Sequence, residues 1–127
     1  MGYRRVPRDR TLAEWVRELE RDGRRGVFYT TKEWKELRAQ VLKDHPLCVD
    51  CLAKSPAEFS RAVYVHHVNE LHDRPDLGLS RTWTDAAGEA HDNLVALCMQ
   101  CHEERHGRFV KGSNGRKKKP ITEERFD

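Results

Sequence analysis

The 127 residues of this chain can bury only one modest hydrophobic core, which excludes a second full-size domain, and a composition of 37% hydrophobic and 35% charged residues predicts that a cross-link supplements packing. No segment approaches the roughly 20 apolar residues of a membrane span, and the N-terminus lacks the apolar stretch of a secretory signal, so we expect a cytoplasmic protein. The formal net charge of +3 slightly favours a polyanionic partner.

Two amphipathic helices are predicted in the N-terminal third. Residues 11–21 place apolar side chains at helical spacing, with a threonine as N-cap and Gly23 as a stop. A second helix should begin where Thr30 or Thr31 can cap it and end before Pro46. It leads the chain directly to the first cysteine.

The remaining sequence predicts two short strands and a third helix. Residues 62–68 are rich in valine, and residues 94–97 form a second short apolar run. The polar connection over residues 72–92 is longer than is usual in a compact domain, which indicates a loop with a function. A helix is expected from about Cys98 to Gly107, followed by a flexible tail.

Four cysteines form two C-x-x-C pairs, Cys48 with Cys51 and Cys98 with Cys101. A C-x-x-C turn presents two thiolates to one ion, and two such pairs complete a tetrahedral structural zinc site. The ion would tie the second helix to the third. A redox pair or plain buried thiols are the alternatives, and two pairs in a small cytoplasmic chain favour the metal.

Four of the seven histidines lie in two groups, His66 with His67 and His102 with His106. Neighbouring residues on a strand project to opposite sides, so the first two cannot do the same job. Residues four apart on a helix share a face, so the other two can reach one ion.

These motifs resemble those of the HNH nucleases of phages and bacteria, a family of the ββα-metal or His-Me finger class. The resemblance rests on the segments Tyr64–Val68 and Asn93–His102, on the flanking C-x-x-C pairs typical of the zinc-containing branch, and on the approach Phe28–Trp34. It extends roughly from Tyr29 to Gly107.

The resemblance implies a role for each matching residue. The general base of the family falls on His67, the first metal ligand on His66, the central asparagine on Asn93 and the second metal ligand on His102. Many phage relatives have aspartate at the position of His66, whereas the colicin DNases resemble the chain more closely there. They also have a histidine where this chain has His106, which makes it a candidate third ligand, although Gly107 is placed to end the helix early.

The chemistry of phosphodiester hydrolysis calls for the same residue types. A histidine, with an unperturbed pKa of about 6.5, can deprotonate water near neutral pH, and a divalent cation can neutralise charge on the transition state. Asn93 can lock a loop or orient the base, although in isolation it is more typical of a turn or cap. A site rich in imidazoles predicts Mn²⁺, Ni²⁺ or Co²⁺ in preference to Mg²⁺.

The expected architecture is an α+β fold with three segments. Residues 1–46 would form an N-terminal helical segment, residues 47–110 the ββα-metal (HNH) nuclease core with its Cys₄ zinc knot, and residues 111–127 a basic flexible tail. Basic residues at the end of the chain could contact phosphates, unless they are only solvated; they are Arg116, Lys117, Lys118 and Lys119.

The function implied is metal-dependent hydrolysis of DNA, by nicking or with low sequence specificity, because contacts to phosphates position a protein without reading bases. Phage relatives are often associated with genome packaging, so a terminase is a further partner that the resemblance suggests. The alternative is a non-catalytic, zinc-dependent nucleic-acid-binding module whose histidines are structural.

Overall fold

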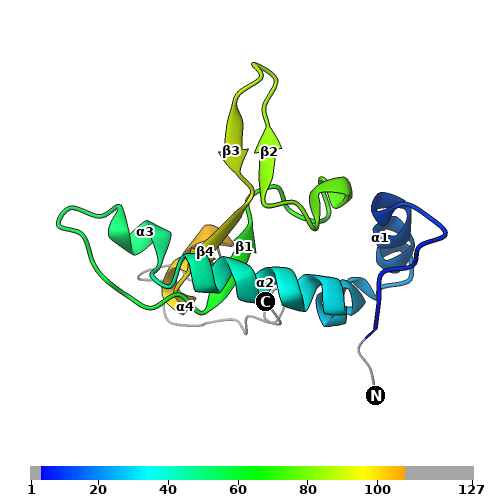
Figure 1. The fold of residues 1–127 in the computed structure, drawn as a ribbon, viewed down its shortest axis with the longest axis horizontal. Coiled ribbons are helices and arrows are strands. Elements are labelled where there is room, and N and C mark those ends of the chain that lie inside the picture. The colour runs from blue at the N-terminus through cyan, green and yellow to red at the C-terminus, as the bar shows by residue number, and fades with distance from the viewer. Residues whose placement is uncertain (1–3, 108–127) are drawn as a thin grey trace.

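The computed structural model describes residues 4–107 (Figure 1). Helices and two small antiparallel sheets occupy separate parts of the chain, which confirms the α+β class. None of the described helices is long and apolar enough to cross a membrane. In chain order the elements are α1 (Leu12–Arg21), the 3₁₀ helix η1 (Arg25–Thr30), α2 (Lys32–Asp44), α3 (Val49–Leu52), β1 (Tyr64–His67), the 3₁₀ helix η2 (Pro75–Leu77), β2 (Thr82–Thr84), β3 (Ala90–Asp92), β4 (Leu94–Leu97) and α4 (Met99–Arg105).

The two N-terminal helices have the predicted caps. The side chain of Thr11 accepts from the backbone N–H of Glu14, whose carboxylate accepts in return from the backbone of Thr11. Gly23 takes a φ of 68° just beyond α1, a conformation that glycine adopts without strain. Thr31, rather than Thr30, caps α2 by accepting from the N–H of Trp34.

The main hydrophobic core joins the N-terminal helices to the β1–β4 sheet. The short helix η1, which the sequence pattern does not predict, places two aromatic rings in this core between α1 and α2. The fully buried residues of this core come from distant parts of the chain and include Val16, Phe28, Trp34, Val41 and Val65.

The β1–β4 sheet separates two environments. The strands pair antiparallel, with His66 opposite Val95 and His67 opposite Leu94. Because side chains alternate along a strand, His66 faces α4 on one side of the sheet, whereas His67 faces α2 on the other. In Figure 1, α2 lies across this sheet.

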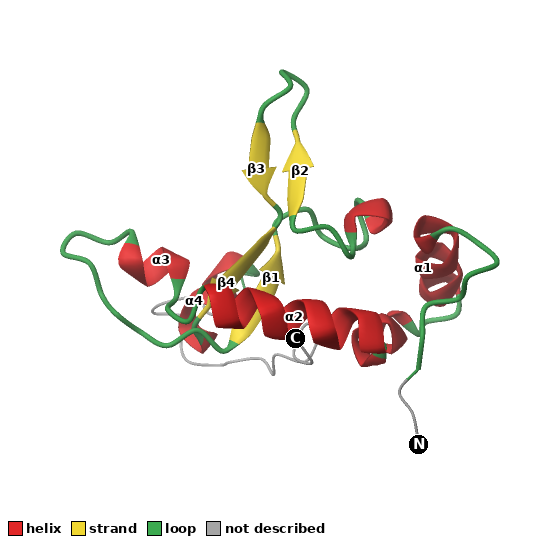
Figure 2. Cartoon of the chain, viewed as in Figure 1, coloured by secondary structure: helices red, strands yellow, loops and turns green. Residues whose placement is uncertain are grey.

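The connection over residues 72–92 is not a simple loop, in contrast to the expectation from the sequence. It contains η2 and a β2–β3 hairpin that projects from the rest of the fold (Figure 2). The turn is held by Asp85, whose side chain accepts from two backbone N–H groups, and by Gly88 at a φ of 89°. Its strands are mostly exposed on both faces, so they lack the apolar alternation that predicts a strand.

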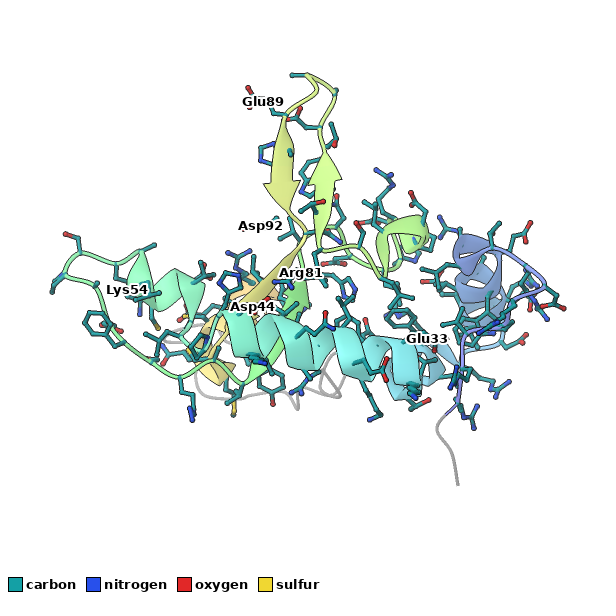
Figure 3. All side chains as sticks on the ribbon, viewed as in Figure 1. Glu33, Asp44, Lys54, Arg81, Glu89 and Asp92 are labelled. Carbon is teal, nitrogen blue, oxygen red and sulfur yellow. The ribbon has the colours of Figure 1, made fainter. Side chains whose placement is uncertain are left out.

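The base of the hairpin is fastened to α2. Arg81 forms an ion pair with Asp44 at 2.9 Å, where α2 ends, and Figure 3 shows the two side chains together there. The backbone carbonyl of Arg81 also accepts from the N–H of Asn93. Glu89, near the tip of the hairpin in Figure 3, lies far from this anchor.

Candidate functional site

The four cysteines converge between two short helices. Cys48 caps the N-terminus of α3 and Cys51 lies within that helix, while Cys98 is the residue directly before α4 and Cys101 lies in its first turn. The first pair thus belongs to α3, a separate helix that the sequence does not predict, and not to the end of α2. All four thiols are free, and their Sγ atoms lie within 4.8 Å of one another.

The sulfur spacing fits a tetrahedral metal site. The Sγ atom of Cys51 lies 3.8 Å from that of Cys98 and 3.7 Å from that of Cys101. Tetrahedral bonds of about 2.3 Å to zinc would separate two sulfurs by about 3.8 Å, whereas a disulfide requires about 2.05 Å. Burial raises the pKa of Cys98 and of Cys101, so without a cation these thiols favour the neutral form.

Three histidines form a second cluster on the α4 face of the sheet. His66 comes from β1, His102 lies within α4, and His106 is the C-cap residue of that helix. The Nδ1 atom of His66 lies 3.2 Å from the Nε2 atom of His106. Two ligand atoms at about 2.1 Å from one ion would be about 3.0–3.4 Å apart, so this donor set fits a divalent cation.

His106 is therefore part of the cluster despite the glycine that follows it. Gly107 takes a φ of 72° and ends the helix just after His106, which keeps α-helical dihedrals. The ring centroids of His102 and His106 are 4.7 Å apart. The early helix end thus leaves this side chain on the same face as His102.

The cluster keeps His66 neutral. Burial, and then the neighbouring imidazoles of His106 and His102, lower the pKa of His66 from 6.5 to about 3. A neutral imidazole has the lone pair that binds a metal. His102 is fully buried, and the ring of Tyr64 stacks on it at 4.6 Å between centroids and 11° between planes. Tyr64 and His102 lie far apart in the sequence, so no local pattern predicts this contact.

His67 occupies the opposite face of the sheet. Its ring stacks on Trp34, with centroids 4.8 Å apart and planes at 22°, and only 4% of the residue is exposed. Its Nε2 atom lies 2.9 Å from the backbone carbonyl of Gly78. A carbonyl can only accept, so Nε2 carries the proton and Nδ1 carries the lone pair.

Asn93 fastens the loop that follows β1. Its Nδ2 atom donates to the carbonyls of Leu77 and Ser80, and its Oδ1 atom accepts from the backbone and the side chain of Asn69. These bonds join Asn93 to the loop at both ends, and its role in catalysis stays a prediction. The same loop contains Gly78, so Asn93 also fixes the carbonyl that meets His67.

The remaining histidines lie outside this arrangement. His72 contacts Glu20, and His91 contacts Asp85 on the hairpin, where Glu89 completes a third, largely exposed group of potential ligands. The basic tail residues predicted to bind nucleic acid lie outside the described residues; they are Arg116, Lys117, Lys118 and Lys119.

Over most of its length this chain is similar to a protein of known structure. It is the HNH endonuclease of the deep-sea thermophilic bacteriophage GVE2, crystallised with manganese ion. The two chains share 29% sequence identity with a TM-score of 0.55, over 74% of this chain and 90% of the phage protein. No family model and no curated protein matches the sequence.

Proposed function

We propose that this chain, which is similar to an HNH endonuclease, is a metal-dependent nuclease of that family that hydrolyses DNA phosphodiester bonds by nicking or by cutting with low specificity. One observation carries the proposal: three imidazoles from β1 and α4 converge at the spacing of metal ligands. A similar phage endonuclease was crystallised with manganese ion, which supports a divalent cation for this cluster.

The two donor sets call for different ions. The four thiolates of the zinc knot would hold Zn²⁺ as a structural cross-link between α3 and α4. The three imidazoles would hold Mn²⁺, Ni²⁺ or Co²⁺ more readily than Mg²⁺, which prefers oxygen. The cation at the imidazoles would neutralise charge on the phosphate and on the departing 3′-oxygen.

The proposed roles of the other site residues follow from their positions. His67 would accept the proton of the attacking water at Nδ1, because Nε2 is occupied by the carbonyl of Gly78. Nδ1 is covered in this structure, so the role requires that Nδ1 become accessible to water when DNA binds. His66 and His67 leave β1 on opposite faces, so in this proposal the phosphate would lie across the end of that strand.

The proposed substrate contacts and partners rest on the sequence and on the phage relative. The basic residues 116–119 would contact phosphates and raise affinity without reading bases. The similar endonuclease comes from a bacteriophage, and a role in phage DNA processing with a terminase partner is consistent with that source.

The rival function is a zinc-dependent nucleic-acid-binding module without catalysis. Such a module needs the four cysteines to bind zinc. It does not need three imidazoles from β1 and α4 at the spacing of metal ligands. The cluster of His66, His102 and His106 therefore favours the enzyme.

Plasmid cleavage by purified protein with added Mn²⁺ tests the proposal. We expect wild type to nick the plasmid, and His67→Ala to lose about 10²- to 10⁴-fold in rate while it still binds DNA, because general-base catalysis is worth that much. His45→Ala is the matched control, since His45 is exposed and lies outside both clusters. DNA binding by wild type without metal-dependent cleavage would favour the rival.

A further inference from the structure

A bidentate ion pair joins α3 and α4, the helices that contribute to the cysteine and histidine clusters. The Nε and Nη2 atoms of Arg105 each donate to one carboxylate oxygen of Asp50, both at 2.7 Å. About a third of each side chain is exposed. This geometry fixes both the distance and the orientation of the two groups, which a single contact between point charges does not.

The pair and the zinc knot hold α4 at opposite ends. Cys98 and Cys101 attach the first turn of α4 to α3, whereas Arg105 attaches its last residue to the same helix. An α-helix of seven residues is too short to be stable alone, and its last turn is the part that frays first.

The last turn of α4 is also where a metal ligand lies. His106 follows Arg105 directly as the C-cap residue, and Gly107 then turns the chain away. The N–H of His106 donates to the carbonyl of His102 and that of Gly107 to the carbonyl of Glu104, so His106 follows the position of the last turn of α4, which Arg105 attaches to α3.

We propose that Asp50 and Arg105 are positioning residues that hold His106 in the metal-binding cluster. The inference rests on the proposed function, because it assumes that the three imidazoles bind a divalent cation. It adds a mechanical link by which α3, the helix of the zinc knot, sets the geometry of the second metal site.

If the pair acted only through its charges, removal of Arg105 would have the opposite effect on metal affinity. Arg105 is the residue before His106, so its positive charge would repel a cation in the cluster. Removal of that charge would then tighten metal binding. Positioning requires that removal of Arg105 weakens metal binding, as removal of Asp50 does.

The test is a Mn²⁺ titration of the zinc-loaded chain, followed by the electron paramagnetic resonance signal of free Mn²⁺. We expect Asp50→Asn and Arg105→Gln each to raise the Kd for Mn²⁺ about tenfold, the usual effect of losing a residue that orients a ligand. Arg105→Lys keeps the charge but not the two-pronged geometry, and it should also raise the Kd. The matched control is Arg74→Gln, which breaks a similar pair with Asp76 away from the clusters and should leave the Kd unchanged.

The background variant His106→Ala separates the possible causes. If Arg105 acts through His106, Arg105→Gln should have no further effect on the Kd once His106 is alanine. Unchanged or tighter Mn²⁺ binding by Arg105→Gln, when His106→Ala weakens binding, overturns the inference and leaves the proposed function intact. Wild type that binds no Mn²⁺, or binds it equally after His106→Ala, overturns the metal site and the inference with it. Zinc content and far-ultraviolet circular dichroism identify any variant that fails to fold. If Arg105→Gln is such a variant, the Kd of Arg105→Lys tests the inference in its place.

Discussion

At the scale of single residues, the low pKa of His66 makes folding sensitive to pH. The folded chain resists protonation of His66 until about pH 3, whereas the unfolded chain takes up that proton near pH 6.5. The unfolded state therefore binds more protons between these values, so stability falls as the pH drops from 6.5 toward 3. Above 6.5 both states are neutral and the contribution vanishes.

We predict that zinc-loaded protein without a second metal loses stability below pH 6.5. The loss should be about 1.4 kcal/mol for each pH unit between the pKa of His66 in the unfolded chain and its pKa in the folded chain. Urea unfolding at pH 7.0, 6.0 and 5.0 measures this loss. His66→Asn cannot titrate, so its stability should fall less steeply over the same range. Equal slopes for the two proteins would contradict the cause given for the shift.

His66 also bears on the choice of metal. An imidazole-rich cluster favours manganese, nickel or cobalt, and a carboxylate at this position would favour magnesium. We predict that His66→Asp moves the optimum for plasmid cleavage toward Mg²⁺. Rates across a metal series compare the two proteins, and a wild type that prefers Mg²⁺ with an unchanged ranking in the variant would remove His66 from the ligand set.

At the scale of elements, the loop after β1 is fitted closely against the core at Gly78. A Cβ atom there would lie 2.8 Å from Cδ1 of Leu71 and 3.2 Å from Cζ of Phe28, although the backbone angle itself suits any residue. The carbonyl of the same residue lies 2.9 Å from Nε2 of His67, so a side chain that displaced this loop would also displace the carbonyl.

We predict that Gly78→Ala costs about 1–3 kcal/mol of stability, the usual effect of overpacking. Cleavage should fall more than Mn²⁺ affinity, because the displaced carbonyl orients His67 and not the three-histidine cluster. Chemical unfolding and the two activity measurements check this. The double variant Gly78→Ala with Leu71→Ala removes the closest overlap, so its loss should be smaller than the sum of the single losses; strictly additive losses would show that the overlap is not the cause.

The elements that could be predicted from sequence are those with local signals. Thr11 and Gly23 bound α1 because capping and positive φ depend on neighbouring residues, and the valines in and beside β1 indicate a strand. The hairpin was missed because its strands are polar and exposed. The helix α3 was missed because four residues give no periodicity.

In the candidate site too, features with a local signal could be predicted and long-range contacts could not. The pairing of histidines at ligand spacing along α4 is visible in the sequence, as is the opposite orientation of His66 and His67. The stacking of Trp34 on His67 and the ion pair of Asp50 with Arg105 join residues far apart in the chain, so no local pattern could show them. The catalytic roles stay predictions.

At the scale of the whole molecule, the basic residues 116–119 determine how the predicted DNA binding responds to salt. Each phosphate contact that is lost should reduce the slope of log K against log salt concentration by about 0.9 on duplex DNA. We predict that deletion of residues 115–127 weakens binding and flattens this slope. Binding isotherms at several salt concentrations give the slope, and an unchanged value would mean that the tail makes no phosphate contacts.

The β2–β3 hairpin has a consequence for the entropy of folding. Pairing of β1 with β4 must close the segment between His67 and Leu94, and the hairpin brings Thr82 opposite Asp92 within that segment. The chain that remains to be closed is then essentially residues 68–81, about half the full length. Each halving of a flexible loop lowers its closure cost by about 0.6 kcal/mol. The hairpin adds no residue to the hydrophobic core, yet it lowers the cost of bringing together β1, which carries His66, and β4, which Asn93 directly precedes.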